Sequence, residues 1–160
     1  MSKIVPHLWY AREAEEAARF YASIFPDSRV DRVTGVANET PSGPPESVKV
    51  VEFTLFGQPF LAISAGPLDT FNHSISFVVN CDDQAEVDRY WDALIAGGGK
   101  AEQCGWLKDK FGLSWQIVPK ALGKLMKDAD RTKAARVGTA MLKMVKLDIK
   151  ALEAAYEGKA

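Results

Sequence analysis

The chain has 160 residues, of which 47% are hydrophobic and 26% are charged, and its formal net charge is −1 at pH 7. This size and composition are typical of one folded domain or two very small ones, and they exclude a disordered or fibrous chain. No run of about 18 apolar residues occurs, so we expect no transmembrane helix. The first residues, MSKIVPHLWY, lack the apolar core of a signal peptide, and we therefore expect a cytoplasmic protein.

The cysteine content excludes two further classes of protein. Cys81 and Cys104 are the two cysteines of the chain. Two cysteines are too few for a disulfide framework or for a zinc site with four cysteine ligands. We expect both to be buried free thiols in a reducing compartment.

The charge is unevenly distributed along the chain. Residues 1–118 carry 10 Lys and Arg against 16 Asp and Glu, whereas residues 119–160 carry 10 against 5. A basic tail can indicate nucleic acid or anionic lipid as a partner. Here the lysines stand singly among apolar residues, as at Lys143, Lys146 and Lys150, which is typical of a solvated helix face. We expect neither a nucleic acid nor a membrane partner.

The first half of the chain predicts the order strand, helix, strand, strand, strand. Glu13–Phe25 is rich in Ala and Glu, with apolar residues at helical spacing, and Pro26 ends it. Residues 38–46 contain three prolines and a glycine, which predicts an exposed loop. The strands are expected over residues 3–10, 28–36, 47–56 and 60–64.

The second half repeats this pattern. Residues 73–80 alternate like a strand, and Asp82 or Asp83 can cap a helix that runs to Leu94 or Ile95. Gly97–Gly99 ends that helix, and further strands are expected within residues 100–110 and 113–118. Because each half is too small to close a core alone, we expect the halves to pair through a joint sheet.

The composition changes after Pro119, where a helical tail is expected. Residues 120–127 predict a short helix, and Asp130 is a plausible cap for a long helix that reaches Tyr156. One face of that helix would be apolar, formed by Val137, Met141, Val145, Ile149, Leu152 and Tyr156. A second edge of Met144, Leu147 and Ala151 widens the apolar face beyond that of an ordinary surface helix. This width predicts a homodimer held together through residues 130–156.

The duplicated β-α-β-β-β order resembles the vicinal oxygen chelate superfamily of glyoxalases, extradiol dioxygenases and bleomycin-resistance proteins. The segments FNHSISFVVNCDDQAEVDRYWDAL and CGWLKDKFGLSWQIVP resemble more closely the PhnB-like family, which is often labelled 3-demethylubiquinone-9 3-methyltransferase. The resemblance implies an α+β fold with a glyoxalase-like domain over residues 1–118. Its two modules, about residues 1–65 and 73–118, would form a cupped mixed sheet, and residues 119–160 would be a C-terminal helical extension.

The superfamily places four metal ligands on strands that line the cup. The resemblance maps these positions onto His7, Ser64, Ser74 and Gln116. One imidazole and one neutral amide provide little affinity for a divalent metal, so we expect no metal and no other cofactor. If a metal were bound, His7 and Gln116 would be its ligands. His73 lies one residue before Ser74 and would face the other side of the strand, and whether it can enter the cup stays open.

Aromatic and polar residues predict a small-molecule pocket in the same cup. Strand alternation puts Trp9 on the face of His7, whereas Trp115 is expected to point into the core, away from Gln116. An apolar cup with a few polar groups is the usual composition of a ligand pocket. The expected ligand-contacting residues are His7, Trp9, Ser64, Ser74, Ser76, Trp106 and Gln116.

Four functions remain open at this point, one of which is a structural or regulatory dimer without a ligand. The first is a small-molecule-binding protein with a degenerate metal site, and the second is a metal-dependent enzyme of glyoxalase or dioxygenase type. The third is a methyltransferase acting on a demethylubiquinone-like substrate, as the family label suggests. The glycines Gly97–Gly99 follow a helix, whereas an adenosyl-binding glycine turn precedes one.

Overall fold

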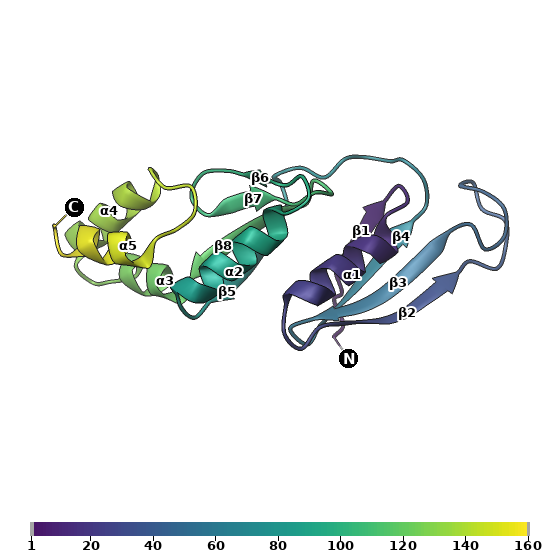
Figure 1. Ribbon diagram of the computed structural model, residues 1–160, viewed down its shortest axis with the longest axis horizontal. Helices are drawn as coiled ribbons and strands as arrows, with labels where there is room; N and C mark the ends of the chain where they lie inside the picture. Colours follow the sequence, from purple (N-terminus) through teal and green to yellow (C-terminus); the bar gives the residue numbers. More distant parts are fainter. Residues whose placement is uncertain (1, 160) are drawn as a thin grey trace. The chain divides into compact units, whose positions relative to one another are not determined.

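The computed structural model describes residues 2–159, and the chain forms two compact units, residues 1–70 and 71–160 (Figure 1). The first unit has one helix, α1 (Ala14–Ile24), and a four-stranded sheet in the order β1-β4-β3-β2. β1 and β4 are parallel, whereas the other neighbouring strands are antiparallel. The strands are β1 (His7–Tyr10), β2 (Arg29–Gly35), β3 (Lys49–Leu55) and β4 (Gln58–Ser64).

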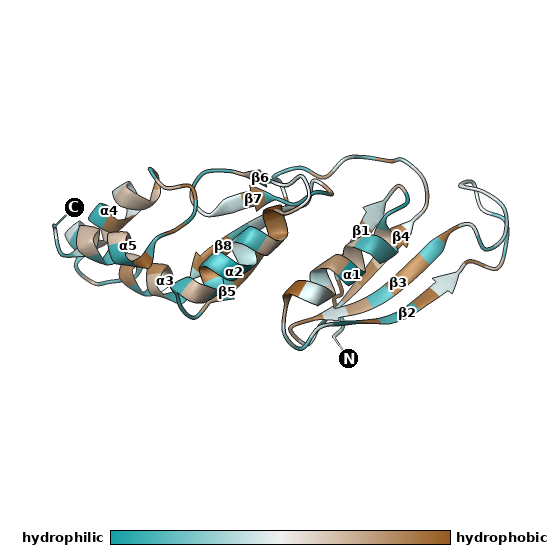
Figure 2. Ribbon diagram, in the orientation of Figure 1, coloured by the Kyte–Doolittle hydropathy of each residue, from teal (hydrophilic) through white to brown (hydrophobic). Residues whose placement is uncertain are grey.

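Helix α1 covers one face of this sheet because its small residues lie on one side. Ala14, Ala17, Ala18 and Tyr21 are fully buried, and Val51 and Phe53 of β3 are buried with them. Figure 2 shows hydrophilic segments interrupting the hydrophobic strand β3, as expected for a sheet with one covered and one uncovered face.

The second unit begins with a module of the same topology. Its strand order is β5-β8-β7-β6, with β5 and β8 parallel. Helix α2 (Gln84–Ile95) follows β5 directly, and the Asp83 side chain accepts a hydrogen bond from the Glu86 amide at its start. The strands are β5 (Phe77–Cys81), β6 (Lys100–Ala101), β7 (Trp106–Lys108) and β8 (Ser114–Pro119). The predicted duplication is therefore confirmed, and each module carries its own sheet.

The C-terminal extension differs from its prediction. It consists of α3 (Lys120–Met126), α4 (Arg131–Met141) and α5 (Ile149–Tyr156). The short helix and the Asp130 cap are confirmed, since the Asp130 carboxylate accepts hydrogen bonds from the Thr132 and Lys133 amides. The expectation of a single helix from Asp130 to Tyr156 is wrong, because the chain turns between α4 and α5.

Hydrogen bonds from the second module explain this break. The amides of Cys104 and Gly105 donate to the carbonyl oxygens of Met144 and Val145, each at 2.8 Å. A carbonyl that accepts such a bond is not available to a continuous helix. The Asp148 side chain then caps the new helix by accepting a hydrogen bond from the Ala151 amide at 3.0 Å.

Folding back of the tail buries the apolar stripe inside the chain. Val137 and Leu152, with Leu122 and Leu147, form a core between the three helices of the extension. Most of the apolar stripe from which a dimer was predicted is therefore buried inside one chain. The most exposed large apolar residues of the extension are Leu142, with 65% of its surface exposed, and Val145 of the stripe, with 41%.

The extension is fastened to α2 by the side chain of Gln84. Its Nε2 donates to the Leu147 carbonyl at 3.1 Å, and its Oε1 accepts from the Ile149 amide at 2.8 Å. Lys146 also forms an ion pair with Asp88 at 2.8 Å. Residues 119–160 thus belong to the same compact unit as the second module.

Within the part of the chain that the structure describes, no helix combines the length and the apolar character needed to cross a bilayer.

Candidate functional site

The uncovered face of the first sheet carries His7 on its edge strand, β1. β1 pairs with β4 so that His7 lies opposite Leu61, and Leu61 in turn lies opposite Glu52 of β3. Paired residues of neighbouring strands share a face, so these three side chains form a row across the sheet. The imidazole of His7 is exposed and makes no hydrogen bond to any described residue. Trp9, on the same face, donates from Nε1 to the Gly66 carbonyl at 2.9 Å.

Glu52 was not predicted as a site residue. Its side chain is 50% exposed, and a carboxylate oxygen lies 4.0 Å from Arg32 of β2. The signal in the sequence is the single carboxylate of the mostly apolar run VKVVEFTLF. An imidazole and a carboxylate thus lie on the same uncovered face, with one strand between them.

Ser64 lies on the opposite face from its predicted one. It is paired with Tyr10, which is buried beneath α1. The Ser64 hydroxyl accepts a hydrogen bond at 3.0 Å from the amide of Ala14, the first residue of α1. The serine therefore satisfies a free amide at the helix start, and His7 and Trp9 do not share its face.

The uncovered face of the second sheet carries the corresponding row. Gln116 of β8 lies between Val78 of β5 and Trp106 of β7 in the register. The Gln116 amide donates from Nε2 to the hydroxyl of Ser76 at 2.9 Å. Val78 is 50% exposed and Trp106 is partly exposed, so the row is accessible. The structure thus brings three predicted residues, Ser76, Trp106 and Gln116, onto one surface.

Ser74 and His73 precede β5 instead of lying in it. The predicted strand 73–80 begins later, at Phe77, and Ser74 is an exposed turn residue whose amide donates to Asn72 Oδ1 at 2.8 Å. Strand alternation therefore does not decide which way His73 points. Its Nε2 lies 2.6 Å from a carboxylate oxygen of Glu102, and its ring centroid lies 6.0 Å from that of Trp106.

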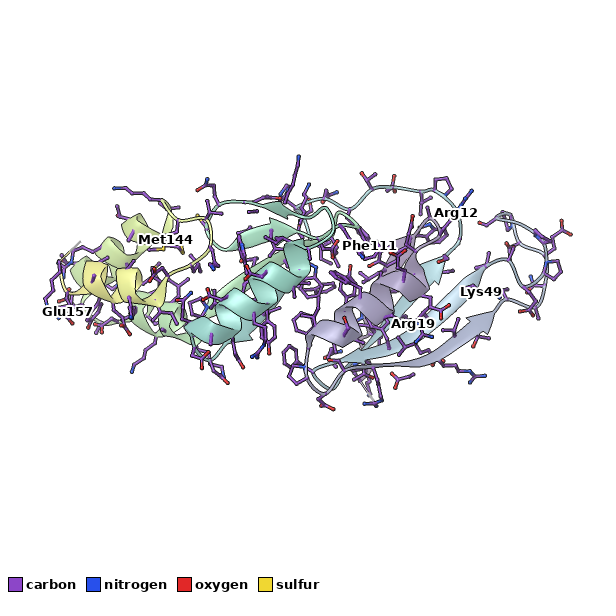
Figure 3. All side chains as sticks on the ribbon, viewed as in Figure 1. Arg12, Arg19, Lys49, Phe111, Met144 and Glu157 are labelled. Carbon is purple, nitrogen blue, oxygen red and sulfur yellow. The ribbon has the colours of Figure 1, made fainter. Side chains whose placement is uncertain are left out.

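The core behind the second sheet contains a buried carboxylate. Asp109 is 3% exposed and lies in the loop between β7 and β8 together with Phe111, which is labelled in Figure 3. It accepts hydrogen bonds from the Phe111 and Leu113 amides and from Trp115 Nε1. Trp115 is 3% exposed, as predicted for a core residue. This network shapes the β7–β8 loop and so sets the ends of the two strands that carry Trp106 and Gln116.

Both cysteines are free thiols. Cys81 is buried, and burial together with the nearby carboxylate of Glu86 raises its pKa to about 12. A thiol with so high a pKa carries almost no thiolate at neutral pH, so Cys81 is not suited to act as a nucleophile. Cys104 is partly exposed, so the expectation that both thiols are buried is wrong for this residue.

The residues on the two uncovered faces do not fit a divalent metal. At the mapped positions on these faces the side-chain donors are the His7 imidazole and the Gln116 amide. Their partners in the register are the apolar residues Leu61 and Val78, and the Glu52 carboxylate lies one strand beyond Leu61. Among residues 2–159, no three side chains of His, Cys, Asp or Glu come together as a metal site would require. A catalytic zinc site normally has three protein ligands.

The glycine cluster serves the turn after α2. Gly97 and Gly98 have positive φ angles of 78° and 125°, and the Gly99 amide donates to the Ile95 carbonyl at 2.9 Å. A Cβ on Gly99 would lie 2.7 Å from the carbonyl oxygen of Lys108, so the turn packs against β7. This geometry explains the glycines by backbone conformation and packing.

Comparison with known proteins places the chain in a family. The model of the family 3-demethylubiquinone-9 3-methyltransferase matches residues 2–118. A putative 3-demethylubiquinone-9 3-methyltransferase, PhnB protein, from Bacillus cereus is 29% identical, with a TM-score of 0.65 over 74% of this chain and 99% of that chain. No curated protein matches.

Two more distant crystal structures share the fold. Protein PA1353 from Pseudomonas aeruginosa is 19% identical, with a TM-score of 0.56 over 74% of this chain and 98% of that chain. The fosfomycin resistance protein FosX from Listeria monocytogenes is 16% identical, with a TM-score of 0.55 over 80% of this chain and 100% of that chain. The α+β fold with two β-α-β-β-β modules, expected from the glyoxalase and bleomycin-resistance resemblance, is confirmed. The chain belongs to the 3-demethylubiquinone-9 3-methyltransferase (PhnB-like) family.

Proposed function

We propose that the chain binds a small organic molecule on the uncovered face of its second sheet, with Gln116 and Trp106 as the main contacts and without a resident metal. The observation that carries this proposal is the fixed orientation of Gln116. Its Nε2 donates to Ser76, which leaves Oε1 without a partner among the described residues. A fixed polar group beside an accessible aromatic ring and an apolar residue is the usual composition of a ligand site.

The neighbouring groups favour a ligand with a polar substituent next to a flat ring. Trp106 presents a large apolar surface that a ring can stack on. The hydrogen-bonded pair of His73 and Glu102 lies at the side of this tryptophan and can accept or donate further hydrogen bonds. The family name points to a quinol-like compound, which has both features.

For the uncovered face of the first sheet, His7 and Trp9 are proposed as a separate ligand-contacting surface. His7 is exposed and has no hydrogen-bond partner among the described residues, so its imidazole is available to a ligand. Ser64 and Ser74 are not included, because Ser64 bonds the start of α1 and Ser74 lies in a turn.

The test is a fragment screen observed by the ¹⁵N NMR signals of the protein. We expect aromatic hydroxy compounds to shift the indole signal of Trp106 and the side-chain amide signal of Gln116. The variant Gln116→Ala should abolish these shifts, whereas Gln58→Ala, an exposed glutamine of β4, should leave them unchanged. Hits that cluster away from Trp106, or no hits at all, would contradict the proposal. S-adenosylmethionine is included in the screen, and saturable binding of it would favour a methyltransferase.

A second copy of this chain is the proposed partner, held through residues 130–156. The support that remains is the exposed pair Leu142 and Val145 in the turn between α4 and α5. Light scattering of the wild type and of Leu142→Asp tests it: we expect a dimer that the substitution converts into a monomer. A wild-type monomer at micromolar concentration would show that the proposal is wrong.

A further inference from the structure

A separate cavity lies at the carboxyl ends of β5 and β8. It has a volume of about 280 Å³ and lies between Asn80 of β5, Val118 of β8 and one side of α3. The cavity could contain about nine water molecules at ~30 Å³ each, so it is large enough for a compact ion with a small organic group attached. Figure 1 shows α3 continuing directly from the end of β8, which brings the helix to this edge of the sheet.

Three lysines of the extension surround this cavity. Lys120, Lys124 and Lys127 line it together. Lys120 and Lys124 are four residues apart, and Lys127 follows three residues later, so the three side chains project from one side of the chain. Like charges at this spacing repel one another unless a negative group lies among them.

Only one of these three charges has an acidic partner. Lys120 forms an ion pair with Asp82, whereas Lys124 and Lys127 are exposed and pair with no carboxylate among residues 2–159. The carboxylate nearest in the chain, Asp128, already accepts hydrogen bonds from the Tyr156 hydroxyl and the Asp130 amide, both at 2.8 Å. Two positive charges beside the cavity therefore remain uncompensated.

The strand side of the cavity adds a neutral donor and an apolar wall. The carboxamide of Asn80 is exposed, and no described residue bonds to it. Its NH₂ group can donate two hydrogen bonds to an oxyanion. Val118 is partly buried beside it and can contact carbon atoms. Ammonium groups and an amide donor around a small volume match the oxygens of a phosphoryl group.

We propose that this cavity binds the phosphoryl group of a small phosphomonoester, with Lys124 and Lys127 as counter-charges and Asn80 as a neutral donor. The site does not depend on the function proposed for Gln116 and Trp106. The chain would then bind two kinds of ligand: a charged phosphate ester in this cavity and a mainly apolar ring beside Trp106.

The test is a calorimetric titration of the full chain at low ionic strength with glycerol phosphate, inorganic phosphate and malonate. We expect one saturable site for glycerol phosphate, weaker binding of inorganic phosphate and no binding of malonate. The double variant Lys124→Gln/Lys127→Gln should raise the Kd at least ~10-fold, because it removes two charged hydrogen-bond donors. Asn80→Ala should raise it by a smaller factor.

The matched control is Lys143→Gln/Lys150→Gln, which changes the net charge equally with two exposed lysines of the same extension. It should leave the Kd within about twofold, since screening limits the effect of distant exposed charges. Equal weakening by both double variants would show a diffuse basic surface and overturn the proposal. So would the absence of saturable glycerol phosphate binding, or malonate binding as tight as that of the phosphate ester.

Discussion

The two β-α-β-β-β modules have the same strand order but differ in what stabilises them. In the first module, β2, β3 and β4 are each seven residues long. In the second module, β6 and β7 have two and three residues. Short strands form few ladder hydrogen bonds and bury little surface. The second module has two further supports, the buried carboxylate of Asp109 and the helices α3–α5.

This difference shows that the C-terminal helices are structural parts of the second module. The Cys104 and Gly105 amides bond to the turn between α4 and α5, and the Gly105 backbone lies against Leu147. A Cβ on Gly105 would approach Leu147 Cδ1 to 2.9 Å. The extension therefore fixes the loop that precedes the short strand β7. The first module, with its longer strands, folds without a helical extension of this kind.

The largest expected effect comes from the core of the extension. Leu152→Ala should lower the free energy of unfolding by about 2–5 kcal/mol, because it leaves a cavity at a fully buried position. Leu68→Ala removes the same atoms at an exposed position of the first unit and should change stability by less than ~0.5 kcal/mol. Urea denaturation followed by tryptophan fluorescence measures both. Similar losses in the two variants would contradict a structural role for the extension.

The next prediction concerns the hydrogen bonds that the buried Asp109 carboxylate accepts in the β7–β8 loop. Asp109→Ala should destabilise the protein by about 3 kcal/mol, because it leaves buried donors, including Trp115 Nε1, without an acceptor. Asp69→Ala, at an exposed carboxylate of the first unit, serves as the control and should be neutral. If Asp109→Ala is also neutral by thermal unfolding, the β7–β8 loop does not depend on this carboxylate.

The smallest effect concerns the ion pair between α2 and the extension. Hydrogen bonds from Lys146 and then Gln84 lower the pKa of Asp88 below its usual 3.8. Because the folded state favours the carboxylate, this stabilisation is present above pH 3.8 and is lost as the pH falls through the lowered pKa. The pair is partly exposed, so Lys146→Met should cost less than ~1 kcal/mol at neutral pH.

The free energy of unfolding measured between pH 2 and 7 tests whether this stabilisation is lost on acidification, since roughly this range spans the titration of carboxylates. We expect Lys146→Met to flatten the acid side of the profile, whereas Lys150→Met should follow the wild type. A larger difference between Lys146→Met and the wild type at acid pH than at neutral pH would contradict the assignment.

Elements that depend on local sequence were predictable, whereas those set by distant contacts were not. Helix α2 carries its own start signal, Asp83, and its own apolar face, so its bounds follow from the sequence. The break between α4 and α5 depends on hydrogen bonds from Cys104 and Gly105, which lie about forty residues away in the chain. The helical spacing of apolar residues continues through the turn, so it does not reveal the break. Most of those apolar side chains are buried in the folded-back arrangement as they would be along one face of a continuous helix.

The same distinction applies to the candidate site. Gln116 and Trp106 share a face because they are paired between β7 and β8, whereas the sequence alone left the face of Trp106 undecided. The orientation of Ser64 depends on the register of β4 against β1, which are far apart in the sequence. That register puts Ser64 beneath α1 and brings Glu52 into the row of His7, a result that one strand alone cannot predict.

The unequal environments of the two thiols make the protein convenient for spectroscopy. Cys81 is buried and its pKa is raised to about 12, so a maleimide dye at neutral pH should spare it. Cys104 is partly exposed and lies two residues before Trp106. One reaction without any mutation should therefore attach a single reporter beside the uncovered face of the second sheet, where ligand arrival could be followed by quenching between dye and tryptophan.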